Sequence, residues 1–532
     1  MRYLLILSIA VFVINYLPVS ATIINIPGDY VTIQAGIDAS SDGDTVLVQP
    51  ETYYENINFN GHNIMLGSLF LITGERDYIE QTIIDGDSSG TVIKIENGED
   101  DSAVITGFTL TNGFAQSGGG IYCSNTSPLI ANNIITDNKA WGGDQSWGKG
   151  GGIYCIDNAS PVITDNEICL NYAQSWTGGG LGGGIYCLYS NLLIENNHLY
   201  DNWVSGTGLG GALYCSDSNV EICDNIIMTN SSSSSGGGIY CSFSQILIKN
   251  SLIRGNISGN GAGAYGSSSS NLVITNSIIE GNHAQYRGGG IGIVRSSNCE
   301  LINDIIYDNF SAWIGGGLYL ADTSVIEAVN SILWADSISD ENSEIYFNDL
   351  SFIQIDYSDI QGGWEGEGNI NIDPLFRDPE IGHLHLMATY CGDPYDSPCI
   401  DMGHPDIADS FLDCNWGLGE FRSDIGAYGG RGVDVNIDEP ENVLPKRISI
   451  FQNYPNPFNA STMIRYELPE QAQVKLAIYD ILGRKVTTIE DGSRPAGYHQ
   501  VLWKADAVAS GIYFYRLQAG DIINTRKMLL VK

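Results

Sequence analysis

Basic residues are scarce over most of this chain. Its 532 residues include 24 Lys and Arg against 62 Asp and Glu, a formal net charge of −38. Residues 447–532 hold 11 of the basic and 7 of the acidic residues, which leaves 13 basic and 55 acidic residues, a net −42, for the rest. Such a body repels nucleic acid, anionic membranes and, unless cations bridge the contact, acidic polysaccharides. The charge therefore argues against nucleic-acid binding.

Long apolar runs are also missing, except at the start. Residues 1–21 combine one basic residue, an apolar core and the small-residue end Val19-Ser20-Ala21. This pattern predicts a signal peptide cleaved near Ala21, with a retained anchor helix as the alternative because the apolar run is long. No later segment is apolar enough to span a membrane, so we expect an exported chain with no membrane span after signal removal.

Cysteine is present, but in an odd number, 11, so at least one thiol is free or pairs with another chain. A repeated hexapeptide, GGGIYC or GGALYC, ends at Cys123, Cys155, Cys187, Cys215 and Cys241. Weaker copies at Gly261–Gly266, Gly288–Ile293 and Gly315–Leu320 continue the series, with intervals of 25 to 32 residues throughout. The chain is therefore built from an internal repeat.

Each hexapeptide is followed by a second segment that closes on Asn, such as Ser127–Asn138 or Ser218–Asn230. Each repeat thus holds three short apolar runs rich in β-branched residues, and none is long enough for an ordinary helix. Helical repeats are excluded by the many Gly, Asn and Ser, and a propeller or up-and-down barrel is disfavoured by the few two-residue hairpin signals. We predict an all-β, three-faced parallel solenoid whose strands stack in register ~4.8 Å apart.

The repeats resemble right-handed parallel β-helix proteins of the pectate-lyase-like architecture over about residues 23–375. The pairing of GGGI with an aliphatic-x-x-Asn element (Ile135–Asn138, Ile227–Asn230, Ile306–Asn309) is also similar to the repeats of polymorphic outer-membrane proteins. Val31–Phe59 is typical of the first coils of such helices, with a short amphipathic helix that places Ile33 and Ile37 on one face to cap the open end. The resemblance implies an architecture rather than an activity.

We expect five parts in the chain. The first two are the signal peptide (1–21) and the capped β-helix (22–375), and three more follow the repeats. Residues 376–432 resemble the closing segment of secreted β-helix chains, and we expect them to cover the C-terminal end. One disulfide is expected among Cys391, Cys399 and Cys414. Residues 433–446 are acidic, contain proline and read as a linker.

Residues 447–532 are basic, cysteine-free and strand-rich, which predicts a small immunoglobulin-like β-sandwich. They resemble the type A C-terminal sorting domain of the bacterial type IX secretion system. The motif residues are Tyr454, Pro455, Asn456, Pro457, Phe458, Asn459, Gly483, Arg484, Gly511 and Tyr513. The resemblance implies contact with that secretion machinery, export across the outer membrane, and release or attachment at the cell surface.

Catalytic patterns are lacking. A lyase needs a base with a positive charge or metal beside it, but Arg254 and Arg287 occupy different coil positions. A hydrolase needs paired carboxylates, and Asp137, Asp201 and Asp308 lie on non-adjacent coils. No cofactor is expected. Calcium is the one ion that acidic turns could hold, best at residues 85–90 and 100–102, although no spaced calcium-loop motif is present.

Tryptophan supplies a stronger functional signal. Trp141, Trp147, Trp176 and Trp203 lie on consecutive coils in the turn between the closing Asn and the glycine triplet, and Trp313 repeats the placement later. Stacked coils would gather these indoles along one edge, where flat aromatic faces suit sugar rings or a protein partner. Alternatively they pack on one another and shield the edge. We expect a carbohydrate-binding or adhesive protein, with a polysaccharide lyase or glycoside hydrolase as the alternative.

The other repeated positions point to scaffold. The hexapeptide cysteines become Gly266, Ile293 and Leu320 in later coils, which indicates buried free thiols rather than ligands. The closing asparagines can bond neighbouring backbone and one another, and they tolerate left-handed dihedrals. We expect a structural ladder of Asn138, Asn171, Asn202, Asn230, Asn256, Asn282 and Asn309.

Overall fold

The computed structural model describes two stretches of the chain. The first is residues 21–430, apart from 145, 177, 339–340, 343, 380–381, 410–411, 413 and 415–416. The second is residues 448–531, apart from 451–452, 454–457, 459–460, 482, 495, 506–507 and 521. The chain forms two compact units, Met1–Val433 and Asp434–Lys532. The predicted signal peptide, up to residue 20, and the predicted linker lie outside the described residues.

Left-handed backbone bends set the length of the strands in the first unit. Asn132 (φ 57°) separates β12 (Leu129–Ala131) from β13 (Ile134–Thr136), and Asp137 (φ 55°) ends β13. Asn and Asp adopt this conformation at lower cost than other non-glycine residues. Because bends of this kind recur after only a few residues, the chain winds into a coil of short strands.

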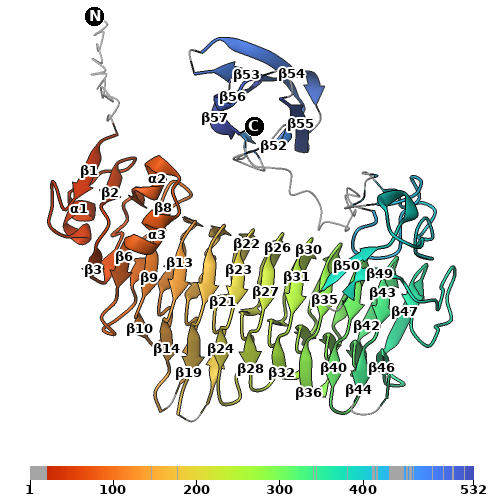
Figure 1. Cartoon of the computed structure of the whole chain (residues 1–532). Coiled ribbons are helices and arrows are strands. Elements are labelled where there is room, and N and C mark those ends of the chain that lie inside the picture. The colour runs from red at the N-terminus through yellow and green to blue at the C-terminus, as the bar shows by residue number, and fades with distance from the viewer. Residues whose placement is uncertain are drawn as a thin grey trace, which may run out of the picture. The chain divides into compact units, whose positions relative to one another are not determined.

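Successive coils stack into four sheets, named A to D, of 13, 12, 11 and 10 strands (Figure 1). Each coil contributes its strands in the order C, A, B, D, and equivalent strands pair in parallel and in register, as in β11–β16 and β12–β17. The predicted all-β parallel solenoid is confirmed. The number of faces differs: the segment after the closing Asn, predicted as a turn, carries a fourth short strand, which forms sheet D.

The strands follow one another within each sheet in chain order. Sheet A contains β1 (Ile23–Ile26), β2 (Thr45–Val48), β5 (Met65–Ser68), β8 (Val104–Thr106), β12, β17 (Val162–Thr164), β22 (Asn191–Glu195), β26 (Asn219–Cys223), β30 (Gln245–Lys249), β34 (Asn271–Thr275), β38 (Asn298–Ile302), β42 (Val325–Val329) and β47 (Phe352–Asp356). Sheet B contains β3 (Thr52–Tyr54), β6 (Ile83–Asp85), β9 (Thr109–Thr111), β13, β18 (Glu167–Cys169), β23 (His198–Tyr200), β27 (Ile226–Met228), β31 (Leu252–Arg254), β35 (Ile278–Glu280), β39 (Ile305–Tyr307), β43 (Ile332–Trp334) and β48 (Asp359–Ile360). Sheet C contains β4 (Ile57–Asn58), β7 (Ile93–Ile95), β11 (Ile121–Ser124), β16 (Ile153–Ile156), β21 (Ile185–Leu188), β25 (Leu213–Ser216), β29 (Ile239–Ser242), β33 (Ala264–Ser267), β37 (Ile291–Ile293), β41 (Leu318–Leu320) and β46 (Ile345–Phe347). Sheet D contains β10 (Phe114–Ala115), β14 (Lys139–Trp141), β19 (Tyr172–Gln174), β24 (Trp203–Val204), β28 (Ser231–Ser232), β32 (Ile257–Asn260), β36 (His283–Arg287), β40 (Phe310–Ser311), β44 (Ser337–Ile338) and β45 (Glu341–Asn342), which pairs antiparallel with β44; β15 (Gly148–Lys149) and β20 (Gly180–Leu181) form a separate pair.

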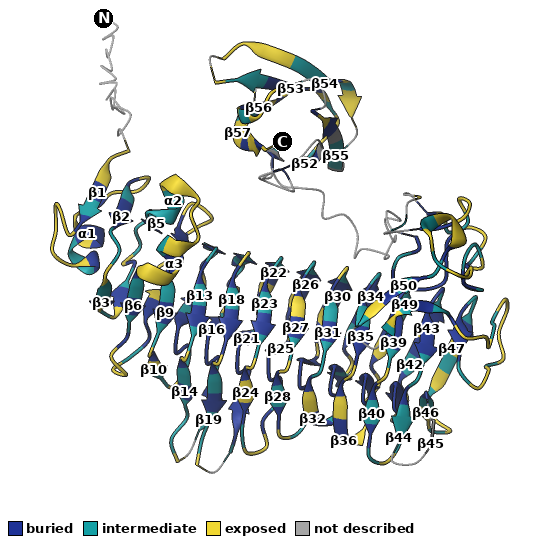
Figure 2. Cartoon of the chain, in the orientation of Figure 1, coloured by how far each residue is buried: buried dark blue, intermediate teal, exposed yellow. Residues whose placement is uncertain are grey.

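The glycine triplet is explained by the close approach of neighbouring coils. Gly118 has φ 64°, a left-handed conformation that favours glycine. A Cβ on Gly119 would lie 2.6 Å from the carbonyl oxygen of Gly151, and one on Gly120 would lie 2.6 Å from that of Gly152. A side chain at these positions would therefore push adjacent coils apart. The strands that follow turn Ile and Cys inward to a continuous buried core (Figure 2).

Both ends of the solenoid are covered. The predicted helix is α1 (Ile33–Ala39), with Ile33 and Ile37 buried and the Thr32 side chain accepting from the Ala35 N–H. Two further short helices, α2 (Phe70–Thr73) and α3 (Asp77–Gln81), lie between β5 and β6. At the far end, Trp364 packs against the same core as the coils.

The closing segment holds β49 (Phe376–Asp378), β50 (His383–Leu386) and the 3-10 helix η2 (Thr389–Cys391). It packs on the outer face of the late strands of sheet B, where Leu384 and Leu386 form a buried cluster with Ile305 and Ile332. The disulfide expected within this segment joins Cys391 to Cys414. The segment therefore covers the outer side of the last coils, whereas the sequence predicted that it would cover their C-terminal end; the apolar outward residues Ile305 and Ile332 account for the difference.

The second unit consists of two antiparallel sheets around its own core, which includes Tyr466, Trp503 and Tyr515. The strands are β51 (Ser449–Ile450), β52 (Ser461–Leu468) and β55 (Gly497–Lys504) in one sheet, and β53 (Ala472–Asp480), β54 (Lys485–Arg494), β56 (Gly511–Ala519) and β57 (Ile522–Leu530) in the other. Phe458, from the sorting motif, is buried in this core beside Leu530.

Candidate functional site

The two faces of sheet D differ in side-chain size. Its inward residues in the early coils are small, and Ala140, Ala173 and Val204 form a buried cluster. Its outward residues include Phe114, Lys139, Tyr172 and Trp203, which are neighbours in register. Large side chains therefore line up along the solenoid on the outer face. The sequence signal for this strand is the alternation in Lys139-Ala140-Trp141 and Tyr172-Ala173-Gln174, which sequence reasoning missed.

The outward aromatic side chains contact one another and a cation. The Tyr172 and Trp203 rings stack with centroids 4.8 Å apart and an interplanar angle of 4°. The Lys139 Nζ lies 4.8 Å from the Tyr172 centroid, 4.6 Å from that of Trp141 and 5.4 Å from that of Phe114. Such ammonium–ring contacts are each worth about 0.5–1 kcal/mol when exposed. They hold these rings in a fixed arrangement at the surface.

Trp141 also contacts Trp176, edge to face, with centroids 5.1 Å apart. Trp176 is 72% exposed, and Trp147 lies on the preceding coil with its indole close to Gly178. The four predicted early tryptophans thus lie on strands β14 and β24 of sheet D or in the loops that follow β14 and β19. We call Phe114, Trp141, Trp147, Tyr172, Trp176 and Trp203 the aromatic strip.

Trp313 lies apart from the aromatic strip. It follows β40, four strands beyond β24 in sheet D, and packs edge to face on Tyr286 with centroids 4.9 Å apart. Between the two groups the outward positions of sheet D are Ser231 and Ile257. The predicted continuous edge is therefore divided into an early group and a later group that contains the Tyr286–Trp313 and His283–Phe310 ring contacts.

A second aromatic ladder runs along sheet C, and its rings are buried or half-buried. The tyrosines stack at centroid distances of 5.0–5.8 Å from Tyr122 to Tyr265. Its members are Tyr122, Tyr154, Tyr186, Tyr214, Tyr240 and Tyr265. Burial raises the pKa of the Tyr154 hydroxyl to about 12, and Tyr186 is only 3% exposed. This ladder is part of the scaffold.

Polar and thiol ladders lie inside the coils. The Asn202 Nδ2 donates to the carbonyl of Ile168 and to the Asn230 Oδ1, and the same pattern links the predicted asparagines from Asn138 to Asn309. The five hexapeptide cysteines are buried, in register and free. Burial raises the pKa of the Cys187 thiol to about 12. The thiols are therefore not poised for nucleophilic chemistry.

The asparagine ladder ends on two carboxyl groups. The Asp336 Oδ1 accepts from the Asn309 N–H at 2.7 Å and from its Nδ2 at 2.9 Å. Asp336 and the nearby Glu344 are buried, and burial raises the pKa of both carboxyl groups, with the charge of Asp336 raising the pKa of Glu344 further. The raised pKa values favour the protonated form over two like charges side by side at this buried end of the ladder.

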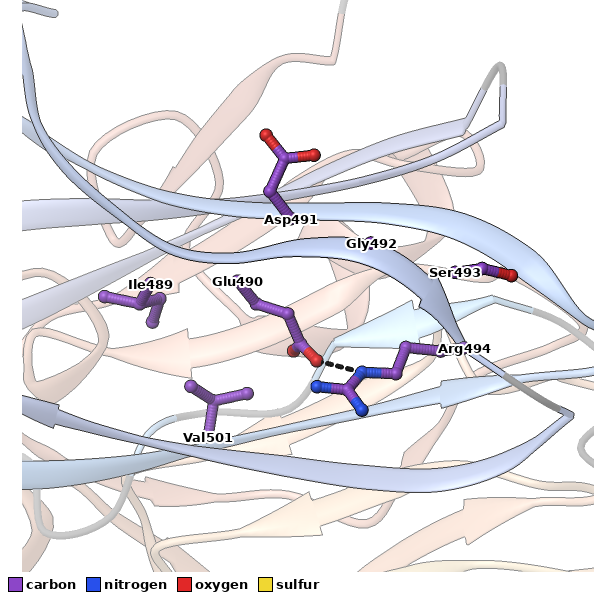
Figure 3. A pocket seen from close by; sticks show the side chains of 7 residues that line it. All are labelled: Ile489, Glu490, Asp491, Gly492, Ser493, Arg494 and Val501. Atoms are coloured by element: carbon purple, nitrogen blue, oxygen red, sulfur yellow. Dashed lines mark hydrogen bonds and ion pairs between the residues drawn. The ribbon is translucent and has the colours of Figure 1, made fainter.

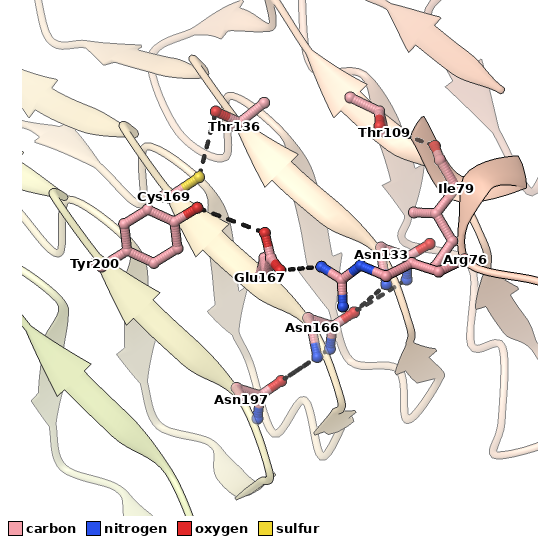
Figure 4. Close-up of polar contacts among 10 residues, drawn as sticks. All are labelled: Arg76, Ile79, Thr109, Asn133, Thr136, Asn166, Glu167, Cys169, Asn197 and Tyr200. Atoms are coloured by element: carbon pink, nitrogen blue, oxygen red, sulfur yellow. Dashed lines mark hydrogen bonds and ion pairs between the residues drawn. The ribbon is translucent and has the colours of Figure 1, made fainter. Parts of the chain in front are cut away.

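Sheet B carries a polar cluster on its outer face near the N-terminal helices (Figure 4). The Arg76 guanidinium, between α2 and α3, forms an ion pair with Glu167 on β18, and the Tyr200 hydroxyl lies 3.4 Å from the Glu167 Oε2. The Cys169 Sγ lies 3.5 Å from the Thr136 Oγ1, and burial raises the pKa of the Cys169 thiol. The ion pair fastens the α2–α3 segment to the coils and neutralises the one carboxylate in this cluster.

The other candidate catalytic residues are not brought together. Arg254 on β31 of sheet B pairs with Glu280, whereas Arg287 on β36 of sheet D lies against Tyr319, so the two lie on different sheets. Asp137, Asp201 and Asp308 all adopt positive φ at the bend from sheet B to sheet D. That position explains their residue type as turn formers.

The closing segment holds buried carboxyls that bind backbone. Asp424 accepts from the Asp401 and Leu418 N–H groups, and Asp409 accepts from the Gly430 N–H. Burial raises the pKa of Asp424 to about 8 and that of Asp409 to about 6. These groups order the loops of the segment.

The second unit contains an open hollow of about 660 Å³ beside β54 (Figure 3). Its lining includes Glu490 and Arg494, which form an ion pair, and the Glu490 Oε2 accepts from the Tyr466 hydroxyl. Among the sorting-motif residues, Arg484 pairs with Asp480 across a turn at Gly483, and Gly511 and Tyr513 lie on β56. Tyr454, Pro455, Asn456, Pro457 and Asn459 lie outside the described residues.

Comparison with known families agrees with both units. Residues 452–532 match the family described as secretion system C-terminal sorting domain. Residues 56–231 and 146–268 match the one described as right handed beta helix region. No curated protein and no solved structure matches the chain.

The protein is therefore a secreted right-handed β-helix protein with a type IX sorting domain, an architecture consistent with the pectate-lyase-like resemblance. The sorting domain indicates secretion or cell-surface attachment in a bacterium with an outer membrane, and implies interaction with the secretion machinery. No helix in the described parts of the chain is long and apolar enough to cross a membrane.

Proposed function

We propose that this protein binds carbohydrate outside the cell, as a surface-displayed or released adhesive protein, through the aromatic strip of sheet D. The main support for this proposal is that exposed aromatic side chains gather on one face of the solenoid. Trp176 is 72% exposed and Trp203 is 38% exposed, and parallel strand pairing fixes the backbone of this face. Flat apolar rings on a rigid support are costly to leave in water and suit the apolar face of a sugar ring.

The charge of the chain favours a neutral glycan. The part of the chain before residue 447 has a net charge of −42, which would repel acidic polysaccharides. Lys139, which contacts the aromatic strip, already lies over the Tyr172 and Trp141 rings. A neutral polysaccharide carries no charge to be repelled and can be held by stacking and hydrogen bonds.

The alternative, a polysaccharide-degrading enzyme, has less support. Retaining and inverting glycosidases use two carboxyl groups about 5–9.5 Å apart. On the outer face of sheet B, Glu167 is engaged by Arg76 and Tyr200 instead. A lyase would need a base beside a stabilising positive charge, and Arg254 and Arg287 lie on separate sheets.

A binding assay on the exported chain tests this proposal. The triple variant W141A/W147A/W176A should lose retention on immobilised neutral polysaccharides and on cells, while F421A, which removes an exposed ring of the closing segment, should bind like the wild type. Product analysis in the same incubations, with and without calcium, should show no new chain ends. Unchanged binding by the triple variant would refute the proposal, and new chain ends would favour the enzyme.

A further inference from the structure

One outward column of sheet D changes abruptly from large to small. The residues in register are Tyr172, Trp203, Ser231 and Ile257, on four successive coils. Tyr172 covers one face of the Trp203 indole in a parallel stack. The opposite face turns toward the next coil, where the residue in register is Ser231. The stack therefore stops at Trp203, and among the described residues no further aromatic side chain stacks on that indole face.

The dimensions of this gap suit one ring. Strands two coils apart are separated by about 9.6 Å. A ring in van der Waals contact with both walls needs about 3.5–4.0 Å on each side, or ~7–8 Å in all. Its walls are accessible, since Trp203 is 38% and Ile257 48% exposed, while Ser231 is half-buried between them. We call this gap the Ser231 slot.

The residue at the floor of the slot, Ser231, is polar. Five consecutive serines, Ser231–Ser235, form β28 and the segment after it. Three of them are used internally: the Ser232 Oγ donates to the Ser235 carbonyl, the Ser233 Oγ donates to the Val204 carbonyl, and the Ser235 Oγ accepts from the Asn260 Nδ2. Within the described residues, no side-chain hydrogen bond engages the Ser231 hydroxyl. It is thus placed to bond a ligand that stacks on Trp203.

We propose that the Ser231 slot is a subsite for one uncharged sugar ring of a neutral glycan, stacked on the free face of Trp203 and hydrogen-bonded at the serine floor. This inference rests on the proposed function and names the position where a ring is inserted. An aromatic face, an aliphatic wall and a hydroxyl floor match the apolar face and the hydroxyl rim of a pyranose. The acidic body disfavours an anionic sugar.

The test fills the slot without damaging the fold. Ser231→Phe would continue the existing Tyr172–Trp203 stack by one rung, so the variant should unfold at the same temperature as the wild type or higher. It should bind immobilised neutral glucan, mannan or xylan, whichever the wild type retains, at least about tenfold more weakly. Ser337→Phe makes the same change in the same column beside Phe310 and should bind normally.

The outcomes separate the two proposals. A wild type that binds none of these polysaccharides refutes the proposed function itself. Retained wild-type binding with unchanged binding by Ser231→Phe overturns the slot and leaves the rest of the aromatic strip as the site. If Ser231→Phe instead abolishes self-association of the chain in sedimentation experiments, the occupant is a side chain of a second copy, and the sugar subsite is wrong. Trp203→Ala, which removes the wall, should lose binding to the same extent as Ser231→Phe.

Discussion

Sheets C and D carry the same kind of aromatic ladder with different exposure. In sheet C the Tyr154 and Tyr186 rings stack 5.0 Å apart and are buried. In sheet D the Tyr172 and Trp203 rings stack 4.8 Å apart, with Trp203 still 38% exposed. Parallel register produces both ladders, so stacking alone says nothing about function. What differs is the degree of exposure: the rings of sheet C are buried or half-buried, whereas the sheet D stack ends on the exposed ring of Trp203.

The largest expected contrast between the two ladders is in stability. Tyr186→Ala should lower the free energy of unfolding by about 3–5 kcal/mol, because it opens a cavity among buried rings. Urea denaturation followed by circular dichroism measures the loss, and Tyr186→Phe, which keeps the ring, serves as the control. A loss below about 1 kcal/mol would show that the sheet C ladder is not scaffold.

Trp203→Ala should give the reverse pattern. The free energy of unfolding should fall by about 1 kcal/mol, the worth of one partly exposed ring contact, while affinity for a neutral glycan falls about tenfold or more. The same urea titration and a retention assay provide the two numbers. Equal stability losses in Trp203→Ala and Tyr186→Ala would erase the distinction between the ladders.

A third prediction concerns the cover over the late strands of sheet B. The pKa of Asp424 is raised to about 8 from its ordinary 3.8 by burial, so between these values the folded chain holds a proton that the unfolded chain releases. This group therefore stabilises the fold in acid, and its contribution declines as pH rises from about 4 to about 8. Thermal melts from pH 5 to 9 should show the decline.

Asp424→Asn should flatten that pH profile, because asparagine does not titrate and keeps one oxygen acceptor for the Leu418 or Asp401 N–H. Asp396→Asn, an exposed carboxyl in the same segment, is the matched control and should leave the profile unchanged. A profile of equal slope in Asp424→Asn and the wild type would contradict the assignment.

The smallest effect is expected inside the coils. When the native protein is treated with iodoacetamide at pH 8, the hexapeptide cysteines should stay unlabelled. They are buried, and the pKa of Cys187 is raised to about 12. Mass spectrometry after unfolding should then find nine alkylated cysteines and one disulfide, Cys391–Cys414. A disulfide between Cys155 and Cys187 would contradict the prediction that the stacked cysteines are free thiols.

The repeat made the solenoid predictable because each hexapeptide reports one coil. Spacing placed Cys123 over Cys155 and Asn138 over Asn171 without knowledge of any contact. The fourth strand was missed because it is only two to five residues long, as in Trp203–Val204, and is followed by loops of varying length. Short strands of this kind depend on the neighbouring coil for their hydrogen bonds, which local propensity does not report.

The aromatic site was only partly visible in the sequence. Tryptophans attract attention by their rarity, and four of them do lie in the early coils. Phe114, Lys139 and Tyr172 were missed because their common column appears only once the strands are paired. The Ser231 slot was hidden for the same reason, since a serine becomes informative only between Trp203 and Ile257.

The thiol column has a consequence for the timing of biogenesis. Nine reduced cysteines are carried by a chain whose sorting domain directs it through an oxidising compartment. Five of them lie one above another at strand spacing, near enough to be oxidised in wrong pairs while the coils are open. The coils must therefore fold faster than their thiols are oxidised. Each newly stacked coil then protects the thiols of the coil beneath it.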